Sequence, residues 1–410
     1  MSLVLFRGGL VYDGAGEEPR EGVEVLVEGA RIKDVSDRPI RAADARVIEL
    51  TGRCLMPGLI DAHFHAIAAD ANLGALEVMP KSLLYQHARR ILEGALARGF
   101  TTVRDAGGAD HGLARAVEGG LIRGPRVFYA GRALSQTGGH GDFRSFEAEA
   151  GACLCCQGSL AMTRIADGVS EVRRAARDEL RKGAHQIKIM ASGGVASPSD
   201  PIWNLQYSDE EISAIVAEAA AWRTYVMAHA YTAEAIARAA RLGVRSFEHA
   251  NLIDEPTARL CAEQGAFVVP TLATYEALHR HGRDLGFPES GLAKLGEVRE
   301  AGLRSLEILK RAGVSMGFGT DLLGDMHQYQ LTEFAIRSQV LGPAEILRSA
   351  TSLNAALLNR TESLGTVAPG AFADLIVVDG NPLADLSVLG GEGEGIALVM
   401  KGGEIFKDLI

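Results

Sequence analysis

The chain of 410 residues is long enough for one large domain with its own core and a smaller second domain. Its formal net charge of −10 excludes a general nucleic-acid-binding surface, because phosphate binding needs clustered positive charge. No apolar run approaches the roughly 20 residues of a membrane helix, and 47% hydrophobic residues suit a globular protein.

The N-terminus and the cysteines both bear on the compartment. The first residues lack the pattern of a signal peptide, and strand-like sequence follows at once. Five cysteines is an odd number, and three of them crowd into residues 153–156 with no partner pair at zinc spacing. Reduced thiols fit this pattern better than a disulfide framework does. We therefore expect a cytoplasmic protein with no membrane partner.

Both ends of the chain show short strand signals separated by turns. The predicted strands are, in chain order, residues 3–7, 9–12, 23–27, 46–50, 373–378, 396–400 and 405–406. We predict that residues 1–57 and 365–410 pair into one small β-sandwich domain.

Between these ends, strand and helix signals alternate. The strand candidates are residues 58–63, 101–105, 126–130, 186–190, 225–229, 245–249, 267–270 and 315–319. Eight strands with helices between most of them predict an α/β fold, a (β/α)₈ TIM barrel over residues 58–364. A capping box at 208–211 predicts the start of one helix, and Gly243 predicts the end of another over 233–242.

Residues 134–168 interrupt this alternation. The segment is rich in Gly and Ser and carries the cysteine cluster together with Phe143 and Phe146. Long loops at the carboxyl end of a barrel are usually functional. We predict that it forms a lid or wall of the substrate site.

Five side chains at strand ends suggest a metal site. His63 and His65 lie two residues apart on a strand, so both point to one face. His229 and His249 end the fifth and sixth strands, and Asp321 follows the eighth. A single strand histidine is usually structural, but these five would meet at the carboxyl end of a barrel. Imidazole nitrogens and carboxylate oxygens are ligands of zinc, so we predict a catalytic metal centre.

Lys188 adds a sixth candidate. It lies inside the apolar strand 186–190, and a buried lysine tends to lose its proton. A neutral amine can react with carbon dioxide to give a carbamate, whose two oxygens could bridge two ions. Taken alone, Lys188 would be interpreted as a paired or snorkelling lysine. Beside the five other residues, we favour the carbamate and a binuclear site.

These motifs resemble the amidohydrolase superfamily over nearly the whole chain. The motifs that carry the resemblance are residues 56–65 (MPGLIDAHFH), 187–194 (IKIMASGG), 228–231 (AHAY), 247–250 (FEHA), 319–321 (GTD) and 369–379 (PGAFADLIVVD). The chain looks most like the members of the imidazolonepropionase-like branch that hold two zinc ions and a carboxylated lysine. Those members act as dipeptidases of the Xaa-Pro or Xaa-Arg/Lys kind, or on N-acyl amino acids. Imidazolonepropionase itself uses one metal and lacks the lysine, so Lys188 argues against that activity.

The resemblance implies two Zn²⁺ ions bridged by carboxylated Lys188 and a hydroxide. The first ion would be held by three side chains and the second by two, namely His63, His65 and Asp321, then His229 and His249. The hydroxide would attack the scissile carbonyl, and Asp321 would pass its proton to the leaving nitrogen. The expected substrate is a small molecule, a dipeptide with C-terminal proline ahead of other dipeptides and N-acyl amino acids.

Such a substrate carries a free carboxylate that needs an anchor. The resemblance points to His140 and Tyr231 in loops at the barrel mouth, with His327 as a contact to the substrate carbonyl. The nearby acids are expected to be solvated loop charges, namely Asp142, Asp200 and Asp325.

Two other functions remain open. The same centre could hydrolyse cyclic amides, carbamates, lactones or organophosphates, which lack the free carboxylate. A non-catalytic scaffold ranks last, because all six ligand positions carry competent residues. Barrels of this kind often associate, but no pattern in the sequence identifies the interface of a homo-oligomer.

Overall fold

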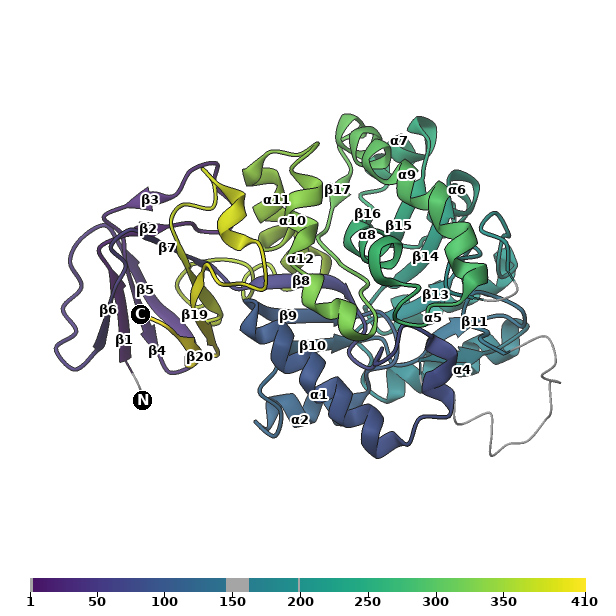
Figure 1. The fold of residues 1–410 in the computed structure, drawn as a ribbon, viewed down its shortest axis with the longest axis horizontal. Helices are drawn as coiled ribbons and strands as arrows, with labels where there is room; N and C mark the ends of the chain where they lie inside the picture. The colour runs from purple at the N-terminus through teal and green to yellow at the C-terminus, as the bar shows by residue number, and fades with distance from the viewer. Residues whose placement is uncertain (1–2, 145–161, 198–199) are drawn as a thin grey trace.

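We analysed a computed structural model that describes residues 3–144, 162–197 and 200–410. Figure 1 shows a smaller region of strands on the left, in which both chain ends lie, beside a larger region of strands and helices. Among the described residues, no helix is both long and apolar enough to cross a bilayer.

The smaller region contains two sheets built from both chain ends. One sheet has the order β5-β4-β1-β6 and the other β20-β19-β18-β7-β2-β3. The strands are β1 (Leu3–Arg7), β2 (Leu10–Val11), β3 (Arg20–Glu21), β4 (Glu24–Glu28), β5 (Arg31–Ser36), β6 (Arg46–Glu49), β7 (Arg53–Pro57), β18 (Leu375–Asp379), β19 (Ile396–Lys401) and β20 (Glu404–Asp408). The ends of the chain meet where β18 pairs antiparallel with β7. Side chains of both sheets share one buried apolar cluster, which includes Phe6, Val25, Leu55 and Leu398.

The larger region is built on parallel strands. Its ladders join β10-β9-β8 in one sheet and β12-β11-β13-β14-β15-β16-β17 in another. These strands are β8 (Leu59–Phe64), β9 (Phe100–Asp105), β10 (Arg126–Tyr129), β11 (Ala133–Ser135), β12 (Thr163–Ile165), β13 (Ile187–Met190), β14 (Val226–Thr232), β15 (Ser246–Leu252), β16 (Phe267–Val269) and β17 (Ser315–Met316).

Backbone hydrogen bonds connect these two sheets at both edges of the three-stranded sheet. Ala62 N donates to Phe318 O at 2.8 Å, which places the chain after β17 alongside β8. At the other edge, His185 N donates to Tyr129 O at 2.9 Å, next to β10. The residues that follow β17 are thereby held against β8, which carries the two histidines of the first motif.

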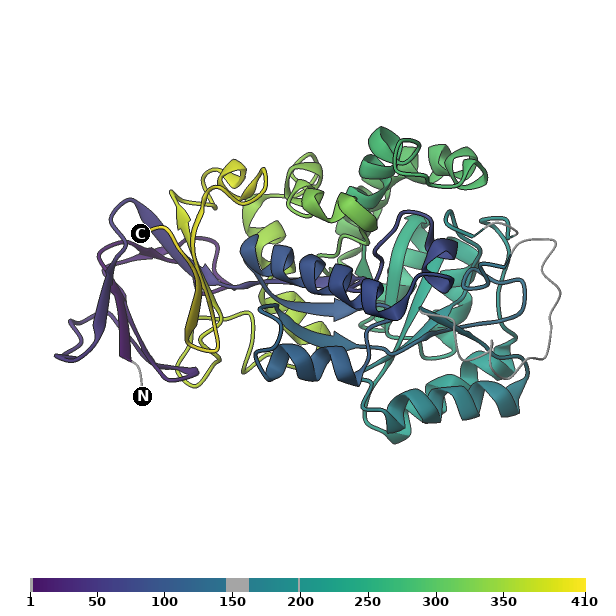
Figure 2. The ribbon, with the colours of Figure 1, turned by 60° about the horizontal axis from the view of Figure 1, so that its bottom comes forward.

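Helices lie on both sides of these strands, as Figure 2 shows. The α-helices are α1 (Lys81–Ala97), α2 (His111–Glu118), α4 (Val169–Arg181), α5 (Asp209–Ala221), α6 (Ala233–Arg241), α7 (Glu255–Glu263), α8 (Leu272–His281), α9 (Glu289–Ala312), α10 (Thr332–Arg337), α11 (Pro343–Ser349) and α12 (Ser352–Leu357). Three short 3₁₀ helices are also present: η1 (Leu73–Glu77), η2 (Gly324–Tyr329) and η3 (Leu386–Leu389). The capping box predicted at 208–211 is formed at the start of α5, and α6 ends just before Gly243.

Two features differ from the sequence prediction. The segment 134–168 is not entirely loop, because β11 and β12 pair in parallel at its base. Strands of three residues are too short to give a periodic signal. The eighth predicted strand, residues 315–319, is reduced to Ser315–Met316, since its continuation bonds to the adjacent chain without forming a regular ladder.

A buried arginine ties α10 to the ends of β16 and β17. The Arg337 side chain is fully buried and pairs with Glu333 at 2.7 Å. Its Nη2 donates to the carbonyl oxygens of Pro270 at 2.7 Å and Gly317 at 2.9 Å. These strand ends therefore depend on one guanidinium for their hydrogen bonds.

We expect Arg337→Ala to lower the free energy of unfolding by about 3–5 kcal/mol, because it leaves Glu333 buried without its counter-charge. Denaturant unfolding followed by fluorescence measures the change. The control is Arg115→Gln, whose pair with Glu118 is exposed and should contribute about 0–1 kcal/mol. Equal effects of the two substitutions would contradict the prediction.

Candidate metal centre

Three of the predicted ligands converge at the carboxyl ends of the strands. His63, His249 and Asp321 each offer one ligand atom, and these atoms all lie within 4.8 Å of one another. His65 joins them, with its Nε2 3.1 Å from Asp321 Oδ1. The two motif histidines and His249 are buried, whereas a fifth of the Asp321 side chain is exposed. The nitrogen and oxygen donors fit a zinc-like cation, and the partly exposed carboxylate reaches solvent.

Partners behind the rings orient the two histidines of the first motif. His63 Nδ1 lies 2.7 Å from Glu248 Oε2, and His65 Nδ1 lies 3.1 Å from the carbonyl oxygen of Gly107. Each ring consequently turns its Nε2 toward Asp321 Oδ1, at 3.3 Å for His63 and 3.1 Å for His65. A partner on one ring nitrogen fixes the tautomer that leaves the other free for a metal.

Glu248 is itself held by a buried arginine. Arg104 Nη2 lies 2.9 Å from Glu248 Oε1, and its Nε donates to Ala62 O at 2.6 Å. Burial by itself would raise the pKa of Glu248, but Arg104 and then His63 lower it to about 2. Glu248 is therefore charged at neutral pH, which strengthens its hold on the His63 ring.

The backbone is strained at two of the ligand candidates. His249 has a φ of 77° and Asp321 a φ of 53°, in the left-handed region that side chains other than glycine rarely adopt. Such conformations cost about 1–3 kcal/mol each and persist where surrounding contacts enforce them. Here His249 Nδ1 lies 2.7 Å from Thr271 Oγ1, and Asp321 N donates to His63 O at 2.8 Å.

His229 stacks on His140, with ring centroids 4.1 Å apart. His229 Nε2 lies 3.1 Å from Gly193 O, and His140 Nδ1 lies 2.9 Å from Ser197 Oγ. A Cβ on Gly194 would come within 2.1 Å of the His140 ring, so only glycine permits this approach. Burial lowers the pKa of His140 to about 3, which keeps the ring neutral.

The chain that follows β13 packs against the His140 ring and is held in place by two buried or half-buried charged side chains. Asp200 is 1% exposed and accepts hydrogen bonds from Ser197 Oγ, Gly194 N and Gln206 Nε2. Lys294 of α9 donates to three carbonyl oxygens of the same loop at 2.7–2.9 Å. The His140 ring is therefore positioned by a hydrogen-bonded segment that contains Ser197 and Asp200.

Lys188 lies in β13 beside β14 and is 2% exposed. Within the described ranges it forms no hydrogen bond and no ion pair within 4 Å. Burial lowers its pKa to about 8, and the carboxylates of Glu248 and Asp321 oppose this shift. An amine in this state has an appreciable neutral fraction near neutral pH.

The structure places the remaining substrate-binding candidates differently. Tyr231 is buried beside the cluster, and its hydroxyl accepts a hydrogen bond from Tyr275 at 3.2 Å. Burial raises the pKa of Tyr231, so the phenol stays protonated. The His327 ring instead packs at a tilt against Phe64, with 5.0 Å between the ring centroids, and Phe64 lies between the two metal-site histidines in the strand. Among the described residues, His327 makes no hydrogen bond with the other site residues, although the charges of His65 and Asp321 act on it.

Two of the acids expected to be solvated are in fact buried. Asp142 is 6% exposed and pairs with Arg144, while Asp200 lies in the hydrogen-bonded segment described above. Both became buried because loop backbone and side chains fold over them and supply donors. Asp325 is exposed as expected and pairs with Arg90 at 2.7 Å. Phe146 and the cysteines at 153–156 lie outside the described residues.

Several partners of the site were not predicted from sequence. These are Arg104, Ser197, Glu248, Thr271 and Tyr275. Arg104 and Glu248 did carry a signal, since a charged residue inside an apolar strand needs a buried partner. Thr271 and Tyr275 carried none, because their role depends on how α8 is placed against β15.

A family model described as the amidohydrolase family matches residues 54–406, and the chain belongs to this family. Membership makes it a hydrolase acting on C–N bonds.

Individual relatives agree with this assignment. A crystal structure of a prolidase complexed with N-methylphosphonate-L-proline is 52% identical, with a TM-score of 0.96, over 99% of this chain and 100% of that one. Ochratoxinase from Aspergillus niger is 34% identical over 99% of this chain and 87% of its own length. Imidazolonepropionase from Ectopseudomonas mendocina is 26% identical over 98% and 97%. The resemblance to prolidase-like amidohydrolases is thereby confirmed.

We expect Thr271→Val to weaken zinc binding by about 10- to 100-fold, because it removes the oxygen that orients the His249 ring. Competition with a chromophoric chelator measures the affinity. The control is Thr274→Val, a buried position on the same helix with no hydrogen bond to the cluster in the described structure. Unchanged zinc affinity in the Thr271 variant would remove this role.

Proposed function

We propose that this chain is a binuclear metal-dependent amidohydrolase that cleaves the amide bond of dipeptides or N-acyl amino acids, with Xaa-Pro dipeptides as preferred substrates. The observation that carries the proposal is the convergence of His63, His249 and Asp321 inside a chain 52% identical to a prolidase. The preference for proline rests on that neighbour, whose ligand is a phosphonate of proline.

The proposal includes the architecture around the site. The two parallel sheets, joined by hydrogen bonds at both edges, would act as one closed (β/α)₈ barrel over residues 58–364. Residues 1–57 and 365–410 would form a separate β-sandwich domain. Supporting this division, the apolar cluster shared by the two sheets of the smaller region is distinct from the cluster of the larger one.

Six side chains would hold two Zn²⁺ ions in this proposal. They are His63, His65 and Asp321 for one ion, His229 and His249 for the other, and carboxylated Lys188 between them. When bound, two such ions supply a water molecule activated near neutral pH and a Lewis acid for the scissile carbonyl. The burial of Lys188 without a counter-ion in contact supports its modification, because an uncompensated buried ammonium is costly.

Asp321 is the proposed proton carrier. Burial alone would raise the pKa of Asp321, but His63 and His65 hold it well below the usual range, so the group is an ionised acceptor. Its partial exposure lets it reach both the attacking water and the leaving nitrogen. Protonation of that nitrogen matters for an amide, because an unprotonated amine anion is a poor leaving group.

His140 and Tyr231 are the proposed anchor for the substrate carboxylate. Both are buried around His229, with Tyr231 in edge-to-face contact at 4.8 Å and His140 stacked at 4.1 Å. Tyr275 positions the Tyr231 hydroxyl as a donor. His327, expected to contact the substrate carbonyl, is not part of this anchor, and its ring packs on Phe64.

We expect zinc-loaded protein to release free amino acid from a library of dipeptides and N-acyl amino acids, fastest from those with C-terminal proline. A ninhydrin or chromatographic assay of the products measures this, and a chelator should abolish the release until zinc is restored. Absence of release from every member, with two ions still bound per chain, would favour cyclic amides, lactones or phosphoesters instead.

We expect Asp321→Asn to reduce kcat by about 10²–10⁴-fold, because the amide cannot accept the proton. Zinc content is measured alongside, so that loss of metal is distinguished from loss of proton transfer. The matched control, Asp325→Asn, changes an exposed acid in η2, four residues along the chain, and should retain wild-type kcat. Near wild-type hydrolysis by the zinc-loaded Asp321 variant would disprove the role.

A further inference from the structure

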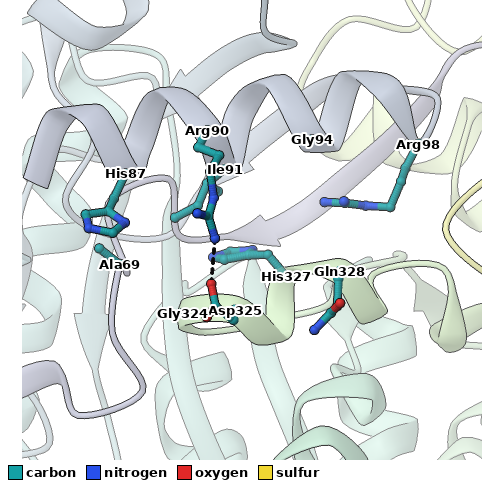
Figure 3. A pocket seen from close by; sticks show the side chains of 10 residues that line it. All are labelled: Ala69, His87, Arg90, Ile91, Gly94, Arg98, Gly324, Asp325, His327 and Gln328. Carbon is teal, nitrogen blue, oxygen red and sulfur yellow. Dashed lines mark hydrogen bonds and ion pairs between the residues drawn. The ribbon is translucent and has the colours of Figure 1, made fainter. Parts of the chain in front are cut away.

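A cavity of about 380 Å³ lies between α1 and η2, separate from the proposed metal ligands. Figure 3 shows its two walls, with Arg90 and Arg98 on α1 or just beyond it and His327 and Asp325 on η2. Arg90 is paired with Asp325 at 2.7 Å, so their charges cancel at the rim. The remaining charged group in the cavity wall is Arg98.

Arg98 is buried but lacks a counter-ion in contact. It is 8% exposed, and its Nε donates to Gln330 Oε1 at 3.2 Å. Its terminal nitrogens Nη1 and Nη2 make no hydrogen bond or ion pair with the residues that the structure describes. Burial lowers the pKa of Arg98 to about 10, and it remains a cation at neutral pH. The carboxylates of Glu392 and Asp61 oppose this shift without contacting the guanidinium, so its terminal nitrogens keep room for an anion.

The buried carboxylate that acts on Arg98, Asp61, already has donors of its own. Asp61 already accepts hydrogen bonds from His63 N, from Thr320 N and Oγ1, and from Gln330 Nε2. Gln330 thus stands between Arg98 and Asp61 as a spacer, and holds the guanidinium in a fixed position.

A glycine makes room for the guanidinium. Figure 3 shows the Arg98 side chain running back along α1 beneath Gly94. A Cβ on Gly94 would lie 3.2 Å from Arg98 Nη1 and 3.5 Å from Nη2. The absence of a side chain there leaves these two donors open to the cavity.

His327 supplies an unused hydrogen-bonding group in the same wall. It is 4% exposed, and neither ring nitrogen has a hydrogen-bond partner of normal geometry in the described ranges. The backbone of Ala68 lies near the His327 ring and opposes the lowering of its pKa. The Ala68 carbonyl oxygen already accepts a hydrogen bond from Gly324 N at 2.8 Å. Buried polar groups without a partner are rare and call for an explanation, a water molecule or a bound ligand.

We propose that this cavity binds a small oxyanion, a carboxylate or a phosphate, through the terminal nitrogens of Arg98 with His327 as a neutral hydrogen-bond donor. Two parallel N–H groups of a guanidinium match the two oxygens of such an anion. The inference does not depend on the proposed substrate, because it uses no group of the metal centre.

The test is calorimetric titration of the zinc-loaded protein with inorganic phosphate and, separately, with acetate. Arg98→Gln should weaken binding of the preferred anion by at least about tenfold, and His327→Phe by several-fold with its packing on Phe64 retained. The matched control is Arg89→Gln, which removes an exposed arginine from the same helix outside the cavity and should leave affinity unchanged. Whichever of phosphate or acetate shows the Arg98-dependent binding identifies the source of the anion.

Zinc can bind the same anions, so the position of the bound anion is determined separately by crystallography. Crystals of the zinc-loaded protein soaked in selenate should give an anomalous peak beside Arg98, and no such peak in the Arg98 variant. The proposal is overturned if the wild-type protein binds neither anion, or if the Arg98 and His327 variants bind both anions as the wild type does. It is also overturned if selenate is found at the metal centre only. A peak beside Arg98 without Arg98-dependent binding in solution marks an adventitious ion only, and equally overturns it.

Discussion

The whole site depends on one chain of short polar contacts that runs from Arg104 through Glu248 and His63 to Asp321. Each link is short, at 2.9, 2.7 and 3.3 Å, and Arg104 and Glu248 are fully buried. Removing one member would leave another charge uncompensated in a medium of low polarity. The chain also crosses strands β8, β9 and β15, so the same interactions that orient a metal ligand hold these strands in register.

The site holds its ligand candidates in place at the cost of backbone strain at two of them. His249 and Asp321 adopt left-handed conformations that only their surroundings stabilise, through Thr271 behind one and the His63 carbonyl beside the other. Such strained positions are common where side chains must converge from different strands. The buried support of His140, built on Asp200 and Lys294, serves the same end in a loop that has no ladder to fix it.

The smaller β region helps to position the site because β7, one of its strands, leads directly into β8. β7 pairs with β18 in that region, and a single residue, Gly58, separates it from β8. Gly58 N donates to Asp374 O at 2.9 Å, which anchors the start of β8 to the C-terminal strands. The position of His63 and His65 is thereby tied to both ends of the chain, although they lie far from its termini in sequence.

The sequence by itself determined the ligand candidates and the strands that carry them. His63 and His65 were predicted because strand alternation and the apolar neighbours are local properties, readable from spacing alone. What only the tertiary structure decided are the groups that act across distance: the Thr271 oxygen behind His249, the burial of Asp200, and the placement of His327 against Phe64. Such contacts join segments far apart in the chain, and no local pattern encodes which side chain will fill the space behind a ring or be covered by a folded loop.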